Sequence, residues 1–130
     1  MSSIVAYRRE MTSPSGQTKL DIVGMSDVGR SYAGVNNKKA EVYIYEMSPG
    51  STNYHLAWKR TVSVANIGDM QVQTEWKNDQ QVRLLFYDYG SMDIYSAKQQ
   101  GVPMKFVAEL CIGKTSGKWG VSGGRGVASQ

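Results

Sequence analysis

Two carboxylates lie close together in a loop that follows a strand-like segment. Asp88 ends a run of alternating apolar and polar residues, and Asp93 follows, with Gly90 between them and Tyr89 and Met92 alongside. Carboxylate oxygens at this spacing can bind a hard cation such as calcium. The aromatic and thioether side chains could instead enter a membrane surface, and the same residue types also form ordinary polar turns. The chemistry of this loop therefore depends on the elements that hold it and on the loops beside it.

The side chains needed for the common catalytic centres are scarce. His55 is the single histidine, so a site with several histidines or a zinc site of cysteine and histidine is excluded. No nucleophile elbow lies near His55, and the segment that ends at Thr115 has Ala108 where a phosphate-binding loop needs glycine. We therefore expect a protein that binds and does not catalyse.

The size and hydropathy of the chain fit one domain. At 130 residues it can bury a working core, and its longest apolar runs are far shorter than the ~20 residues that span a bilayer. No apolar signal segment follows the N-terminus, so we expect a cytoplasmic protein whose association with a membrane, if any, is peripheral. Cys111 is the one cysteine and lies in an apolar string, which predicts a buried and unreactive thiol.

The net charge is modestly positive. The 15 lysines and arginines stand against 11 aspartates and glutamates, which gives +4 at neutral pH. The basic residues are dispersed and form no long run, so the chain has no polybasic tail. The surplus fits an anionic membrane surface, whereas the absence of a basic stripe makes nucleic acid the less favoured partner.

Strand signals recur at short intervals, with turn-forming residues between them. No segment keeps a helical apolar stripe, and one short helical turn over Tyr95–Gln100 is the most that we expect. The pattern predicts an all-β fold, an antiparallel eight-stranded β-sandwich over residues 1–120, followed by a flexible glycine-rich tail over residues 121–130. The expected strands are Ile4–Arg9, Lys19–Gly24, Ala40–Met47, Leu56–Ala65, Met70–Trp76, Val82–Asp88, Met104–Ile112 and Lys118–Val121.

The order of these strands resembles that of the C2 domain family, and the copine-type C2 domains most of all. The resemblance extends from about Lys19 to Lys114 and rests on the segments Leu20–Asp27, Glu41–Tyr45, Lys59–Asn66, Val82–Asp88 and Phe106–Gly113. It implies an eight-stranded sandwich that docks on phospholipid, often through calcium.

The resemblance also implies a ligand set for calcium. Asp27, Asp88 and Asp93 match carboxylate positions of the family, and Asn36 or Asn37 would be auxiliary oxygen donors. The family gathers about five carboxylates, so the set here is incomplete, and because affinity rises with carboxylate number we expect calcium binding to be weak or absent. In the alternative interpretation Asp27 and Asp88 cap turns by accepting backbone N–H bonds.

A lipid-docking surface follows from the same resemblance. The loops over residues 25–37, 66–70 and 89–102 would lie together at one end of the sandwich. Aromatic and sulfur-containing tips would enter the headgroup zone, and cations would meet anionic phospholipid. The expected lipid-binding residues are Arg30, Lys38, Lys39, Lys98, Tyr89 and Met92. Alternatively, the apolar residues of these loops fold back and close the end of the core.

The sequence is also compatible with a function in binding proteins and not lipids. Tyr43 and Tyr45 lie on one face of an expected strand, and tyrosine is enriched at protein interfaces. The chain could therefore be a protein-interaction or self-assembly module, with a sheet edge or this tyrosine face meeting a partner protein or a second copy.

Overall fold

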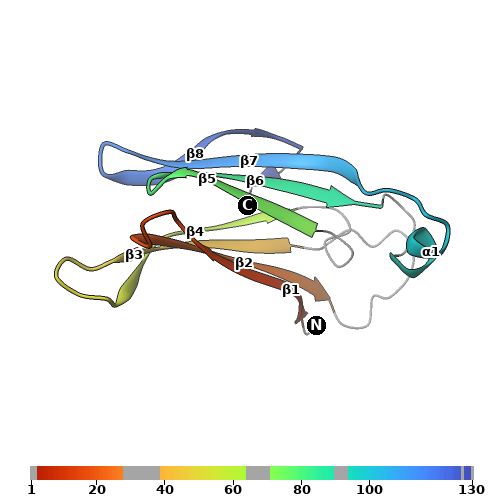
Figure 1. Cartoon of the computed structure of the whole chain (residues 1–130), viewed down its shortest axis with the longest axis horizontal. Helices are drawn as coiled ribbons and strands as arrows, with labels where there is room; N and C mark the ends of the chain where they lie inside the picture. The colour runs from red at the N-terminus through yellow and green to blue at the C-terminus, as the bar shows by residue number, and fades with distance from the viewer. Residues whose placement is uncertain (1–2, 28–38, 64–70, 90–93, 127, 130) are drawn as a thin grey trace.

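The protein consists of two antiparallel β-sheets packed face to face, in a computed structural model that describes residues 3–27, 39–63, 71–89, 94–126 and 128–129 (Figure 1). The predicted eight-stranded antiparallel sandwich is confirmed, with one additional short strand. The first sheet contains β1 (Ser3–Thr12), β2 (Thr18–Asp27), β3 (Lys39–Met47), β4 (Tyr54–Ser63) and β9 (Ala128–Ser129). The second contains β5 (Gln71–Asn78), β6 (Gln81–Asp88), β7 (Lys105–Thr115) and β8 (Lys118–Arg125), and α1 (Ile94–Gln99) lies between β6 and β7 in the chain.

Each sheet is a meander, in which strands that follow one another in the chain also lie next to one another. The order is β1-β2-β3-β4-β9 in one sheet and β5-β6-β7-β8 in the other. The chain passes between the sheets after β4 and returns after β8, where β9 pairs with β4 through Val62 and Ser63. Antiparallel neighbours need only a short connection, so most of this topology is built from hairpins.

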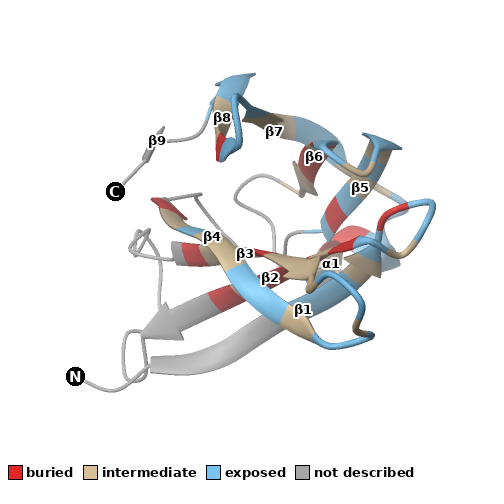
Figure 2. Cartoon of the chain, turned by 90° about the vertical axis from the view of Figure 1, so that its left-hand side faces the viewer, coloured by how far each residue is buried: buried red, intermediate tan, exposed pale blue. Residues whose placement is uncertain are grey.

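The core lies between the two sheets and follows the alternation of each strand. Leu20 and Ile22 of β2 are fully buried, as are Leu84 and Phe86 of β6 from the opposite sheet. Figure 2 shows buried residues in strands of both sheets. Burial of one such side chain contributes about 1.5–3 kcal/mol, so this layer is the main source of stability.

Tight turns gather at the end of the sandwich opposite α1 (Figure 1). Ser116 and Gly117 join β7 to β8 with φ angles of 53° and 79°. Two successive positive φ values define a two-residue turn whose twist matches that of the flanking strands, and this turn fixes the register of the hairpin. We refer to this end of the sandwich as the turn end.

Polar contacts hold the two sheets together at the turn end. The hydroxyl of Ser15 donates to Asp79 Oδ2 at 2.6 Å, and the Thr18 hydroxyl donates to the Asp79 carbonyl at 2.8 Å. Lys114 Nζ of β7 lies 2.6 Å from Glu46 Oε2 of β3, so an ion pair also joins the sheets. The hydrogen bonds from Ser15 and Ser13 hold the pKa of Asp79 below its ordinary value.

Residues 121–125, which the sequence assigns to a flexible tail, lie in β8. Glycine permits a close approach of this strand to its neighbour. A Cβ atom on Gly124 would lie 2.5 Å from the carbonyl oxygen of Glu109, and one on Gly126 would lie 2.7 Å from that of Val107. Glycine at these two positions therefore allows the backbone to lie close to β7. From composition alone, the same glycines favour disorder.

The pKa of Glu46 gives the inter-sheet ion pair a defined pH dependence. Burial alone would raise this pKa, but the hydrogen bond and the positive charge of Lys114 hold it below its ordinary value of 4.5. A carboxyl group with a lower pKa in the folded than in the unfolded chain stabilises the fold above that ordinary value. The stabilisation is lost as the pH falls through the folded-state pKa.

We expect Glu46→Gln to lower the free energy of unfolding at pH 7 by about 1.5–3 kcal/mol, the range for a hydrogen bond to a charged group. At pH 3, below the ordinary pKa of 4.5, the loss should be smaller, because protonation of this carboxyl in the unfolded chain already removes part of the stabilisation. Urea unfolding followed by tryptophan fluorescence measures both values. Glu75→Gln is the control, since Glu75 is 54% exposed and 3.7 Å from Arg83, and should cost under ~1 kcal/mol. An equal loss at both pH values would contradict the role of the ionised Glu46.

Candidate functional site

Two of the predicted calcium ligands end strands at the same end of the sandwich. Asp27 is the last residue of β2 and Asp88 the last of β6, and both strands run toward the end that carries α1 (Figure 1). Their side chains, and all of Asp93, Asn36 and Asn37, lie outside the described part of the structure. In the part that is described, no three acidic, histidine or cysteine side chains are grouped to hold a metal. Calcium binding therefore stays a prediction from the sequence.

The predicted lipid-binding residues divide in the same way. Arg30, Lys38 and Met92 lie outside the described residues. Lys39 begins β3, where its backbone pairs with β2 and β4, and its side chain is not described. Tyr89 follows β6 and is half-buried, whereas Lys98 is exposed on α1. The backbones of these three residues lie at the α1 end of the sandwich (Figure 1).

The helix α1 presents an aromatic and a basic side chain to solvent. Ala97 is fully buried, whereas Tyr95 is 71% exposed and Lys98 is also exposed. The amide of Val102 donates to the Ala97 carbonyl at 2.9 Å, and Gly101, with a φ of 68°, ends the helix. Because Ala97 fixes which side of α1 packs inward, Tyr95 and Lys98 must face outward.

A second aromatic side chain is exposed near the start of β7. Phe106 is 40% exposed and lies edge-on to Tyr87, with ring centroids 5.9 Å apart. Strict alternation with Ala108 and Leu110 would place Phe106 in the core. A bulge in β7 changes this, because Ala108 pairs with Phe86 while Phe106 pairs with Tyr87, which leaves one extra residue between them. The sequence pattern carries no signal for such a bulge, so Phe106 was not among the predicted site residues.

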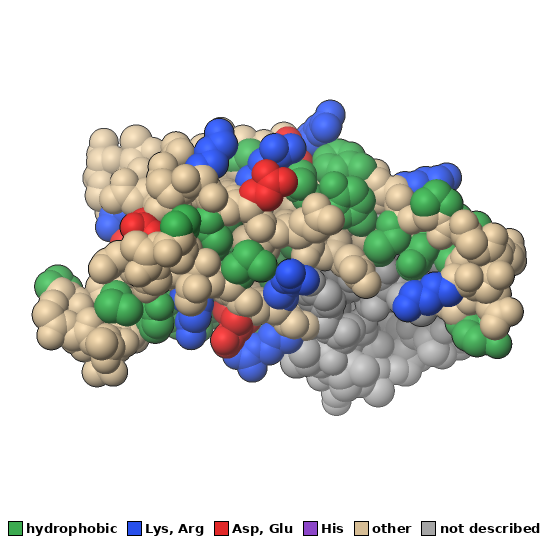
Figure 3. All heavy atoms as spheres, viewed as in Figure 1, with side chains coloured by type: hydrophobic (Ala, Val, Ile, Leu, Met, Phe, Trp, Pro, Cys, Tyr) green, Lys and Arg blue, Asp and Glu red, His purple; other side chains and the backbone are tan. Residues whose placement is uncertain are grey.

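Two exposed lysines lie near these aromatic residues in the chain. Between residues 94 and 108 the chain contains Lys98 and Lys105 and no carboxylate, and both lysines are exposed. Figure 3 shows basic and hydrophobic side chains, and no acidic ones, among the described atoms at this end in that view. We define the α1 surface as Tyr95, Lys98, Lys105 and Phe106.

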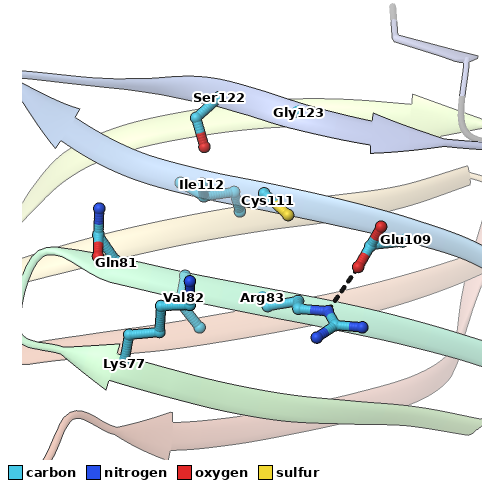
Figure 4. Close-up of a pocket in the computed structure, with 9 residues that line it drawn as sticks. All are labelled: Lys77, Gln81, Val82, Arg83, Glu109, Cys111, Ile112, Ser122 and Gly123. Atoms are coloured by element: carbon cyan, nitrogen blue, oxygen red, sulfur yellow. Dashed lines mark ion pairs between the residues drawn. The ribbon is translucent and has the colours of Figure 1, made fainter.

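A separate hollow lies on the outer face of the second sheet. It has a volume of about 330 Å³ and is lined by side chains from all four strands, among them Arg83 and Cys111 (Figure 4). The charge of Arg83 is compensated, since Arg83 Nε lies 2.5 Å from Glu109 Oε2 and Arg83 Nη1 lies 3.7 Å from Glu75 Oε1. Glu109 and Arg83 both line the hollow and neutralise each other, which leaves Lys77 as the remaining cation of the lining, so the hollow is a weak site for an anion.

Cys111 lines this hollow and is only half-buried, so the prediction of a buried thiol is wrong. Leu110 and Ile112 occupy the core positions of β7, and alternation turns the residue between them outward. Glu109, two residues earlier, lies on the same outward face. That polar neighbour was the signal in the sequence that could have placed Cys111 correctly.

We expect Cys111 of the native protein to react with iodoacetamide without prior unfolding, because its side chain borders an open hollow. Mass spectrometry of the labelled protein under native conditions measures this, and Cys111→Ser should take up no label. A native protein that reacts only once denaturant has unfolded it would contradict the outward placement.

The outer face of the first sheet carries the tyrosines that the sequence placed together. Tyr43 and Tyr45 are stacked with ring centroids 6.3 Å apart. Lys19 Nζ lies 5.0 Å from the centroid of Tyr45 and 5.1 Å from that of Tyr54, and Lys59 Nζ lies 5.6 Å from that of Tyr43. These contacts occupy the aromatic rings within the sheet, so the rings are not open platforms for stacking nucleic-acid bases.

Tyr43 is the titratable group of this face with a large shift. Its hydroxyl donates to Glu41 Oε2 at 2.5 Å. That hydrogen bond, together with burial and the Glu41 charge, raises the pKa of Tyr43 from 10.0 to about 12. Because the pKa is raised on folding, the contribution of Tyr43 to stability is complete below pH 10 and is lost as the pH rises through 12.

We expect an ultraviolet titration of tyrosinate to include a late step near pH 12 that comes from Tyr43. Tyr43→Phe should remove that step, and Tyr95→Phe should leave it in place. A late step that persists in Tyr43→Phe would show that another tyrosine causes it.

No family model, curated protein or solved structure matches this chain. The structure assigns the protein to one fold class, the all-β antiparallel sandwiches of two sheets. The resemblance to C2 domains rests on the sequence segments alone. None of the described helices is both long and apolar enough to cross a bilayer.

Proposed function

We propose that the protein is a non-catalytic module that docks peripherally on anionic phospholipid membranes through its α1 surface. The observation that carries the proposal is the 71% exposure of Tyr95 on α1, which also carries the exposed Lys98, with the exposed Lys105 following at the start of β7. An exposed aromatic ring beside cations suits the headgroup region, where the ring is partly desolvated and the cations approach phosphate.

The expected strength of this docking is modest. A cation near an anionic membrane contributes about 1 kcal/mol, so Lys98 and Lys105 together contribute roughly 2 kcal/mol, or about a 30-fold gain in binding. Insertion of Tyr95 and Phe106 adds an apolar contribution that does not depend on salt. Stable attachment then needs both contributions, which predicts reversible binding that weakens as the ionic strength rises.

Calcium is an optional part of this proposal. The resemblance to C2 domains would place Asp27, Asp88 and Asp93 around a calcium ion with help from Asn36 or Asn37. The α1 surface is already basic without a metal, so docking should not require calcium. Calcium that did bind near Asp88 would add positive charge at the same end of the sandwich and strengthen the attraction.

We expect the protein to sediment with vesicles of phosphatidylserine and phosphatidylcholine but not with pure phosphatidylcholine vesicles. The double variant Lys98→Gln/Lys105→Gln should bind about 30-fold more weakly, because two cations are removed from the membrane side. Lys77→Gln/Lys118→Gln is the matched control, since it removes two exposed cations near the turn end. That control should bind within about twofold of the wild type.

Two further experiments separate the contributions of the aromatic ring and of calcium to membrane binding. Tyr95→Ser should weaken binding while leaving its salt dependence unchanged. Each assay is repeated with calcium and with a chelator, and a calcium-dependent gain that Asp88→Asn abolishes would assign the metal site. Equal losses in the two double variants, or equal binding to neutral vesicles, would overturn the proposed docking surface.

A further inference from the structure

The free edges of the two sheets differ in how they are protected. In the first sheet β1 is one edge, and at the other β9 covers β4 at Val62 and Ser63. In the second sheet the edges are β5 and β8. An edge strand offers unpaired N–H and C=O groups to any extended chain, and proteins commonly block such edges with charged side chains.

The edge at β8 lacks the mixed charges of the others. Within β1, Arg8 lies beside Glu10, and within β5, Glu75 lies beside Lys77. β8 has the sequence KWGVSGGR, with a cation at each end and no carboxylate. In the described part of the chain its only pairing partner is β7.

The side chains of β8 leave its edge open. Trp119 is buried, and Val121 packs against the core from the same strand. Residues 122–125 are exposed, and a Cβ atom on Gly123 would meet nothing within 4 Å. A chain that approaches this edge therefore meets backbone and not a barrier of side chains.

The two cations of β8 have no carboxylate partner. Among the ion pairs of the described residues, none involves Lys118 or Arg125. Arg125 instead lies over the ring of Phe106, with its Cζ 4.8 Å from the ring centroid. Lys118 pairs with Thr115 and Arg125 with Glu109, so both cations belong to positions on the outer face of the sheet.

These charges argue against a second copy of the chain as the occupant. If two β8 strands paired in an antiparallel manner about their midpoint, Lys118 of each copy would lie opposite Arg125 of the other. Like charges directly opposite in a strand pair are destabilising. The complementary occupant is a strand with acidic residues at the corresponding positions.

We propose that β8 is a docking edge for an extended acidic segment of a partner protein, which adds to the second sheet as a further strand. The main-chain groups of the edge would supply affinity, and the two cations would set register and orientation. On its paired side, β8 places Arg125 opposite Glu109 of β7 and Lys118 opposite Thr115, and these two β7 residues are six positions apart. A segment on the free edge therefore needs two carboxylates six residues apart to face the same two cations. This inference does not rest on the membrane-docking proposal, because it concerns a different kind of partner and uses the strand edge of β8, although the two surfaces meet where Arg125 lies over Phe106.

The probe is a blocked synthetic peptide with the sequence Glu-Val-Thr-Val-Thr-Val-Glu, titrated into the isotopically labelled full chain. The expected result is saturable change in the amide NMR signals of β8, with those of β1 and β5 unchanged. The double variant Lys118→Glu/Arg125→Glu should weaken binding by about tenfold or more, and so should replacement of both glutamates of the peptide by lysine. Lys77→Glu, on the edge strand β5, is the matched control and should alter binding by less than about twofold.

The neutral double variant Lys118→Gln/Arg125→Gln keeps the test valid if charge reversal disturbs folding, and it should weaken binding by an intermediate factor. Signals that change on β1 or β5, or no saturable change at β8, would overturn the proposal. So would binding that ignores both double variants. The last experiment is analytical sedimentation of the free protein, with hydrogen exchange of the β8 amides. A dimer whose β8 amides exchange slowly would identify a second copy of the chain as the occupant instead.

Discussion

The structure depends on one constraint, which is that every long strand must bury one of its two faces between the sheets. Phe86 and Leu84 from one sheet meet a layer that includes Ile22 from the other, all fully buried. A shift of one residue in any strand would turn its apolar set to solvent and its polar set inward. The outward positions, and thus all the surfaces available for binding, follow from this packing.

The two ends of the sandwich differ in the length of their connections. At the turn end, short hairpins and inter-sheet contacts such as Ser15–Asp79 and Lys114–Glu46 close the structure. The connections at the other end are longer and include α1, whose buried Ala97 fixes the exposed positions of Tyr95 and Lys98. Binding residues tend to lie on connections that a rigid framework positions, and only this end has connections of sufficient length.

Charge compensation explains where the positive surplus of the chain becomes available. On the sheet faces, basic side chains pair with acidic ones, as Arg83 does with Glu109 and Arg8 with the buried Asp21. The exposed cations of α1 and β8 lack such partners within the described residues. A net charge of only +4 can still mark particular surfaces, because Arg8, Lys59, Arg83 and Lys114 are compensated by carboxylates on the sheets.

The sequence by itself determined the class of fold and the eight long strands, because alternation and turn residues are local signals. It also placed Tyr43 and Tyr45 together and gave α1 to within a residue at each end. Only the tertiary structure decided that Phe106 faces outward, that residues 121–125 continue β8, and that β9 pairs with β4. Each of these depends on a bulge, a backbone approach or a pairing between distant segments. The energies that decide such features arise between strands and are absent from the pattern within any one strand.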